Sequence, residues 1–153
     1  MALSRRTTLA LTAALLALAA LVFGLPWWLY QQGLAAYDQL PQPPAQLASP
    51  TEQQQVWQRA GAAEAPEAVA LNPVSYLLSA TVQARPPEIT AYAWRVASDH
   101  SRTHLPQTEG PLKRHLAGAA LTIWLTRQWR VEQLLSRIAE LERIATAAPG
   151  SPA

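Results

Sequence analysis

Three consecutive basic residues, Lys113, Arg114 and His115, are the side chains best placed to bind a charged group. They follow Pro111, and proline is favoured at the first position of a helix, so we expect them in a first helical turn. This end of a helix carries a partial positive charge, which attracts phosphate and disfavours cations. Basic residues at this end are interpreted first as a solvated face or a contact with lipid headgroups, and phosphate binding is the alternative interpretation.

His100 and His104 are four residues apart and could share a metal ion on one helix face, with Asp99 beside them. The surrounding segment, 98–110, is polar and is predicted to be an irregular connection. No third strong ligand lies nearby in the sequence. We therefore interpret both histidines as solvated surface residues and predict no metal site.

Other signals of catalysis are missing from the sequence. The 153 residues include no cysteine, which excludes disulfides, thiolate metal sites and a cysteine nucleophile. There is no glycine-rich phosphate loop and no serine in the glycine-flanked pattern of hydrolases. The net charge of +2 is too small to indicate nucleic acid binding. We predict no catalytic residue, no cofactor and no nucleic acid partner.

The segment from Thr7 to Tyr30 contains no charged residue and is long enough to span a bilayer of ~30 Å as a helix. Arg5 and Arg6 precede it and are expected to stay in the cytoplasm. Aromatic residues at its far end favour the headgroup region. The sequence thus predicts a single-pass anchor in a bacterial inner membrane, with the N-terminus inside and the rest of the chain in the periplasm.

A cleaved signal peptide is the alternative interpretation of this segment. The triplet Ala17–Ala19 has the small-x-small pattern of a cleavage site. However, the apolar run continues to Leu29, which is longer than the ~7–15 residues of a signal core. We favour an uncleaved anchor.

The remaining chain is predicted to be all-α, with no segment typical of a β-strand. Its longest helical periodicity runs from Pro111 to Glu140. Thr51 and Asn72 are expected to cap two shorter helices, and Pro87 to open a third. The tryptophans at 57, 94, 124 and 129 are expected in the core, or alternatively on a surface that faces a partner or lipid.

The predicted organisation is a cytoplasmic N-terminus (1–6), a transmembrane anchor (7–30), a proline-rich tether that stands off the membrane (31–50), a helical domain (51–145) and a disordered tail (146–153).

The C-terminal helices resemble a motif of glycosyltransferase family 51, the peptidoglycan glycosyltransferase domain of penicillin-binding proteins. The motif has the form L-x-R-K-x-x-E-x-x-x-A-x-x-L-E-x-x-x-S-K-x-x-I-L. At the same spacing this chain has Leu112, Arg114, His115, Gly118, Leu125, Thr126, Arg130, Val131, Leu134 and Leu135. The apolar frame and Arg114 fit, whereas Gly118 and Thr126 replace two glutamates of the motif.

Two upstream segments extend the resemblance to about residues 71–140. RPPEITAYAWR is similar to the family's G-G-S-T-I-T-x-Q-L-A-R, with Ile89, Thr90 and Arg95 matching, and LNPVSYLLSA is similar to its D-P-x-x-x-x-R-A helix. The motif that carries the family's catalytic glutamate is not found. The resemblance therefore implies a lysozyme-like, transglycosylase-derived helical domain without catalysis. Its anion contacts would be made by Arg114, Lys113, Arg95 and Thr90.

The resemblance implies binding in the cell wall, to a lipid-linked glycan precursor or to cell-wall synthesis proteins. An active, divergent glycosyltransferase is one alternative, and it requires Glu52, Glu64 or Glu67 to act as the missing base. A membrane-anchored adaptor without a glycan ligand is another, in which Trp94 or Trp124 docks a protein partner.

Overall fold

The structure is a computed structural model that describes residues 5–61, 65–79, 87–106 and 108–147. Helices form every regular element within these ranges, which confirms the all-α prediction. In chain order they are α1 (Arg5–Ala19), the π-helical turn η1 (Ala20–Gly24), α2 (Leu25–Leu34), α3 (Pro50–Arg59), α4 (Pro73–Ser79), α5 (Glu88–His104), α6 (Pro111–Gln128) and α7 (Val131–Ala147).

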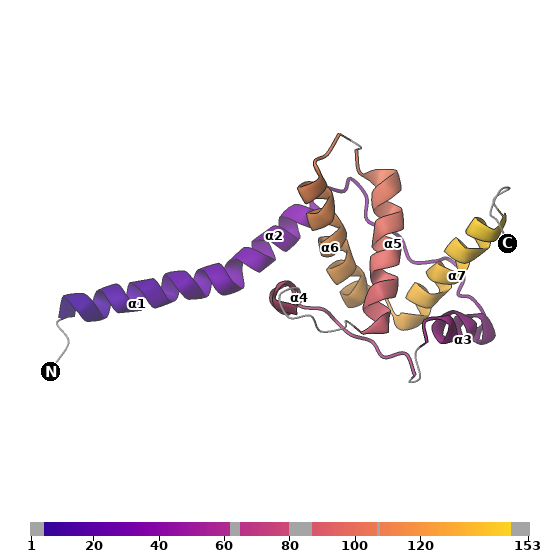
Figure 1. Cartoon of the computed structure of the whole chain (residues 1–153), viewed down its shortest axis with the longest axis horizontal. Coiled ribbons are helices and arrows are strands. Elements are labelled where there is room, and N and C mark those ends of the chain that lie inside the picture. Colours follow the sequence, from indigo (N-terminus) through magenta and orange to yellow (C-terminus); the bar gives the residue numbers. More distant parts are fainter. Residues whose placement is uncertain (1–4, 62–64, 80–86, 107, 148–153) are drawn as a thin grey trace.

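The elements α1, η1 and α2 are continuous and form one N-terminal rod, which projects away from the other helices (Figure 1). Its segment Thr8–Leu34 is long and apolar enough to cross a membrane, and its most apolar window has no buried residue. The wide turn η1 ends two residues before Pro26. Proline lacks an amide proton and crowds the carbonyl four residues back, so a local π-turn lets the rod continue through it.

The far end of this rod packs against the domain through one face of α2. Pro26, Tyr30 and Gly33 recur at helical spacing and are all buried. Tyr30 forms a small apolar cluster with Ala120 and Ile123 of α6. Consequently the apolar helix and the domain meet through a packed contact.

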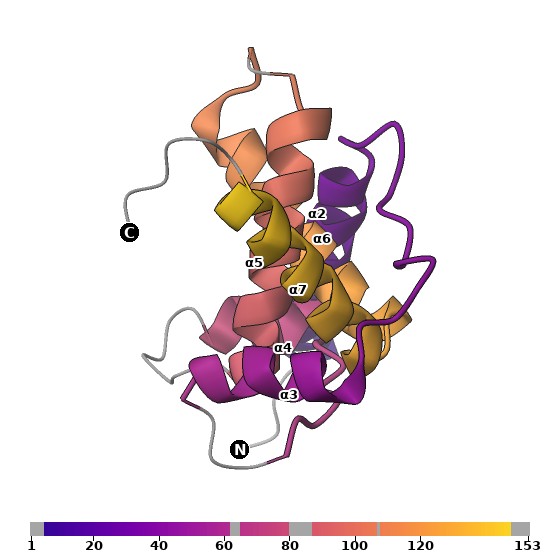
Figure 2. The same ribbon diagram turned by 90° about the vertical axis from the view of Figure 1, so that its right-hand side faces the viewer.

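The main core lies between α5, α6, α7 and α3, and α5 runs beside α6 in both views (Figures 1 and 2). Its most enclosed side chains include Leu121, Leu125, Leu134, Ile138 and Val56. Tyr92 of α5 donates a hydrogen bond to the backbone oxygen of Val56 at 2.5 Å, which joins α3 to this core.

The prediction of an irregular segment at 98–110 is wrong over its first half, because α5 continues to His104. Hydroxyl groups bond back to the preceding turn: Ser101 Oγ donates to the Ala97 oxygen at 2.6 Å, and Thr103 Oγ1 to the His100 oxygen at 3.0 Å. These bonds satisfy the polar side chains within the helix. Pro106 follows the last turn, and a proline disfavours helical geometry in the residue before it.

Residues 35–49, which we call the strap, were predicted to stand off the membrane as part of the tether, but they lie along the domain and connect α2 to α3 (Figure 2). Tyr37 is buried and its hydroxyl lies 2.6 Å from Ser101 Oγ. The amide of Ala48 donates to Ser136 Oγ of α7 at 2.9 Å. Prolines give the strap an extended backbone, and its apolar residues together with these hydrogen bonds hold it on the surface.

The helix caps differ in part from the predictions. Ser49, and not Thr51, caps α3: its hydroxyl accepts from the Glu52 amide, and the Glu52 carboxylate accepts from the Ser49 amide. The cap at Asn72 is confirmed, because its side-chain oxygen accepts from the Val74 amide at 2.8 Å. The predicted helix end at 85–87 and the tail at 146–153 lie largely outside the described residues.

Candidate functional site: a basic groove between α5 and α6

An open groove of about 440 Å³ lies between the C-terminal half of α5 and the N-terminal half of α6. Within the described part of the chain, its lining holds three basic side chains and an aromatic ring but no carboxylate. The lining residues are Trp94, Ser98, Ser101, Arg102, Pro111, Arg114, His115 and Gly118. An anionic ligand would therefore meet positive charge and hydrogen-bond donors here.

Two arginines reach the groove from opposite helix ends. Arg102 lies in the last turn of α5, where a cation is stabilised by the helix dipole. Arg114 lies in the first turns of α6, where the dipole opposes a cation and favours a bound anion. Each guanidinium can offer paired N–H donors to phosphate oxygens. The arrangement is thus suited to a phosphate or pyrophosphate group.

Trp94 provides an apolar platform at one wall of the groove. Its side chain is 36% exposed, and its ring lies 5.7 Å from the His115 ring, centroid to centroid. Gly118 lies beside this wall, and a Cβ at that position would be in ordinary van der Waals contact with the Trp94 ring, at 3.5 Å. Aromatic faces exposed in a polar groove can support the apolar face of a ligand.

The other predicted anion contacts do not join this groove. Lys113 forms an ion pair with Glu109 at 2.6 Å. Arg95 points to α7, where it contacts Glu142 at 3.2 Å. Thr90 is buried, and its hydroxyl has no hydrogen-bond partner within the described ranges. Of the four predicted residues, the structure places only Arg114 in the groove.

Sequence reasoning missed Arg102 because it expected α5 to end before this residue. Helical spacing would have provided the signal, because Ser98, Ser101 and Arg102 lie four, seven and eight residues after Trp94 and so share its helix face. Because the predicted helix ended before Arg102, this shared face was not predicted.

The positions at which the resemblance expects carboxylates have other roles. Thr126 is buried, and its hydroxyl donates to the Ile123 oxygen at 2.9 Å and accepts from the Leu71 amide at 3.3 Å. It therefore connects α6 to the segment before α4. Gly118, as described above, faces the ring of Trp94.

Two candidate bases of the enzyme alternative, Glu52 and Glu67, are not among the residues that line the groove. Glu52 is held in the cap of α3, and its hydrogen bonds from the Ser49 backbone and side chain lower the pKa of its carboxyl group. A lower pKa makes a carboxylate a weaker base. Glu67 is exposed in the segment before α4, and Glu64 lies outside the described residues.

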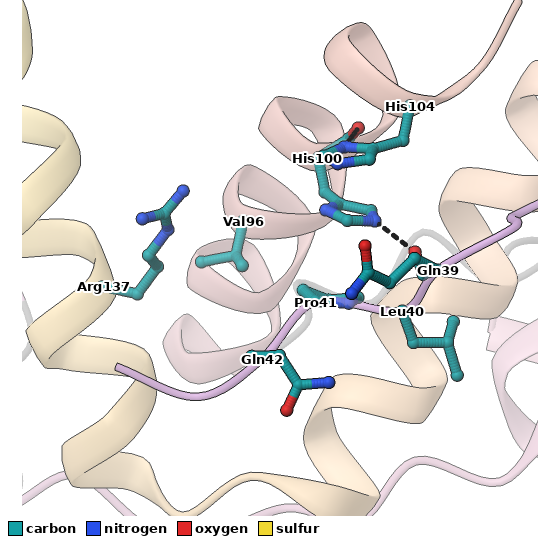
Figure 3. Close-up of a pocket in the computed structure, with 8 residues that line it drawn as sticks. All are labelled: Gln39, Leu40, Pro41, Gln42, Val96, His100, His104 and Arg137. Atoms are coloured by element: carbon teal, nitrogen blue, oxygen red, sulfur yellow. Dashed lines mark hydrogen bonds between the residues drawn. The ribbon is translucent and has the colours of Figure 1, made fainter. Parts of the chain in front are cut away.

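A second pocket, of about 220 Å³, lies where the strap crosses α5 (Figure 3). The prediction that both histidines are solvated is wrong for His100, which is buried and donates from Nε2 to the Gln39 oxygen at 2.9 Å. Its ring stacks on that of His104 with centroids 3.9 Å apart. Burial lowers the pKa of His100, and neighbouring His104 and Arg137 add to the effect, while the Gln39 bond and Asp99 oppose it.

His100 fastens the strap through its bond to Gln39, and His104 stacks on His100. Among the residues that the structure describes, no three histidine, cysteine, aspartate or glutamate side chains form a group that could hold a metal ion. The groove between α5 and α6 is therefore the better candidate for ligand binding. No protein-family model, curated protein or solved structure matches the chain.

Proposed function

We propose that the protein is a membrane-anchored binding protein whose helical domain faces the periplasm and holds a lipid-linked glycan precursor by its phosphate groups. In this proposal Thr8–Leu34 spans the inner membrane with the N-terminus inside. The domain descends from a lysozyme-like peptidoglycan glycosyltransferase domain and has lost its reaction. The proposal follows from the sequence resemblance together with the groove between α5 and α6.

The observation that carries the proposal is the convergence of Arg102 and Arg114 beside Trp94 in a groove lined by no described carboxylate. Two arginines match the charge and the oxygen geometry of a pyrophosphate. The tryptophan ring offers a flat surface to an attached sugar. Glycosyl transfer requires a general base near the acceptor hydroxyl, and the side chains named in the lining supply none except a histidine.

The height of the groove above the bilayer is compatible with a lipid-borne ligand. Gly33, which contacts the Leu116 region of α6, lies six residues beyond Trp27, or about 9 Å along a helix. Arg114 is two residues before Leu116. A phosphate carried by a membrane lipid can therefore reach the groove without leaving the membrane surface.

Binding of a short prenyl-pyrophosphate disaccharide to the full chain in nanodiscs tests the proposal. Removing both groove arginines (Arg102→Gln with Arg114→Gln) should weaken binding by about tenfold or more, since a hydrogen bond to a charged group contributes ~1.5–3 kcal/mol. Arg95→Gln is the matched control, because Arg95 contacts Glu142 instead of the groove. Unchanged affinity in the double variant would contradict the proposal.

Polymerisation of the lipid-linked precursor by the purified chain separates binding from the enzyme alternative. The proposal expects precursor binding without polymer. Polymer that disappears in Glu52→Gln or Glu67→Gln would establish an enzyme in place of a binding protein.

A protein-docking adaptor is the second candidate, and the packed junction between α2 and α6 favours it. Tyr30 and Gly33 are buried against the domain, so a partner docked on the domain would be held at a fixed place relative to the membrane helix. Capture of a membrane protein that depends on Trp94, with no affinity for the glycan probe, would support this candidate over the first.

A further inference from the structure

The position of the outer membrane boundary can be estimated along the N-terminal rod. Trp27 lies twenty-one residues after Arg6, which is about 30 Å along a helix and equals the thickness of a hydrocarbon core. Trp27 and Trp28 are 38% and 57% exposed, as expected for rings at the headgroup layer. This estimate depends on the proposed insertion of Thr8–Leu34.

The helical domain contacts the rod as far as Trp27, at the estimated membrane boundary. Pro26, which precedes Trp27, is already buried. The guanidinium carbon of Arg127, in the last turn of α6, lies 5.6 Å from the centroid of the Trp27 ring. Arg127 Nη1 also donates to the backbone oxygen of Leu71 at 3.2 Å. Arg127 therefore joins α6, the rod and the segment before α4 at the estimated membrane boundary.

We propose that the face formed by Trp27, Trp28, Arg127 and α4 rests in the headgroup layer, where Arg127 binds the phosphate of a phospholipid. The bond to Leu71 uses one of the five N–H donors of a guanidinium, and Arg127 is exposed. The helix dipole favours a cation at the C-terminal end of any helix, so the dipole alone does not indicate a lipid ligand. Arg127 lies beside Trp27 at the estimated membrane boundary, and this position makes a phospholipid the proposed ligand.

The location of α4 supports the same orientation. Figure 1 shows α4 on the side of the domain from which the N-terminal helix projects. Asn72 and Ser75 are exposed there, and Val74 is half-buried. Exposed small polar side chains at this place can lie against the polar headgroup layer.

The absence of native cysteine allows a direct test with single-cysteine labels on the full chain in phospholipid vesicles. A fluorophore at Ser75→Cys should be quenched by headgroup-spin-labelled lipid at least about twofold more than one at Thr108→Cys, an exposed site in the α5–α6 connection. Equal quenching at the two sites in an inserted chain would overturn the proposal.

Charge variants test the role of Arg127 in the Ser75→Cys background. Arg127→Gln should reduce the quenching, and Arg127→Lys should restore part of it, because lysine also binds phosphate. Arg143→Gln removes the same charge from the exposed end of α7 and should leave quenching unchanged. An effect of equal size in both glutamine variants would contradict phosphate binding by Arg127.

The same preparation distinguishes failure of this inference from failure of the proposed function. Extraction of the chain by alkaline carbonate would show that Thr8–Leu34 does not span the bilayer, and would overturn both. If the chain stays in the membrane but the label at Ser75→Cys is quenched no more than the label at Thr108→Cys, only the proposed orientation is overturned. Glycan binding is then tested by its own variants.

Discussion

Gly33 of α2 and Ala120 of α6 approach so closely that a Cβ added to Gly33 would lie 2.5 Å from the Ala120 Cβ. It would also lie 2.8 Å from the backbone oxygen of Leu116. These distances are shorter than van der Waals contact, so only glycine permits this packing. The junction between the apolar helix and the domain therefore depends on one residue without a side chain.

Gly33→Ala should destabilise the domain, because overpacking costs about 1–3 kcal/mol while the gain in helix propensity is at most about 1 kcal/mol. Gly118→Ala is the matched control, since its Cβ would meet only the Trp94 ring at 3.5 Å. The free energy of unfolding in detergent, followed by near-ultraviolet circular dichroism, should fall for the first variant only. Equal stability of the two variants would show that the junction is looser than the structure indicates.

Trp94→Leu should weaken binding of the prenyl-pyrophosphate disaccharide more than binding of inorganic pyrophosphate. The ring is expected to support a sugar, whereas the arginines hold the phosphates. Loss of an aromatic contact is expected to lower the affinity by about tenfold, as ~1.5 kcal/mol corresponds to this factor. Titration calorimetry with both probes measures the difference. A similar loss for both probes would mean that Trp94 acts by shaping the groove.

The domain should lose stability as the pH falls below the ordinary histidine value of ~6.5. Burial lowers the pKa of His100 in the folded state, so the unfolded chain binds more protons between the two values. The protonated ring would face His104 and Arg137, with Asp99 as the nearby opposite charge. The melting temperature should therefore be lower at pH 5 than at pH 7.5, and nearly constant above pH 7.

A His100→Gln variant checks the origin of this dependence. It removes the titrating group and should flatten the profile, whereas His115→Gln, which alters the ring beside Trp94, should leave the profile unchanged. If the profile of His100→Gln keeps its slope, another group is responsible.

Ser49→Ala should cost about 1 kcal/mol of stability, because it removes the cap of α3. Thr51→Ala, two residues later, should have little effect, since Thr51 is exposed inside the first turn. Urea unfolding of both variants distinguishes the observed cap from the one that the sequence suggested. A larger loss for Thr51→Ala would reverse the assignment.

Local chemistry controls several elements, and these can be predicted from the sequence. The uncharged run after Arg6 is helical throughout, as α1, η1 and α2, because it consists mostly of good helix formers such as Ala and Leu and the π-turn accommodates Pro26. Asn72 caps α4 and Pro111 opens α6, as their side chains require. The polar residues after Ala97 wrongly predict a loop, because their hydroxyls bond back to the helix and allow α5 to continue.

Which of these elements contact one another depends on long-range packing and could not be predicted from the sequence. The strap was expected to be a free tether because its prolines prevent regular structure, but proline does not prevent packing, and Tyr37 is buried against α5. Arg95 and Arg114 were assigned to one site from motif order, yet they lie on different faces, one at α7 and one in the groove. Helical spacing gives the face that a residue occupies, whereas the partner of that face depends on long-range packing.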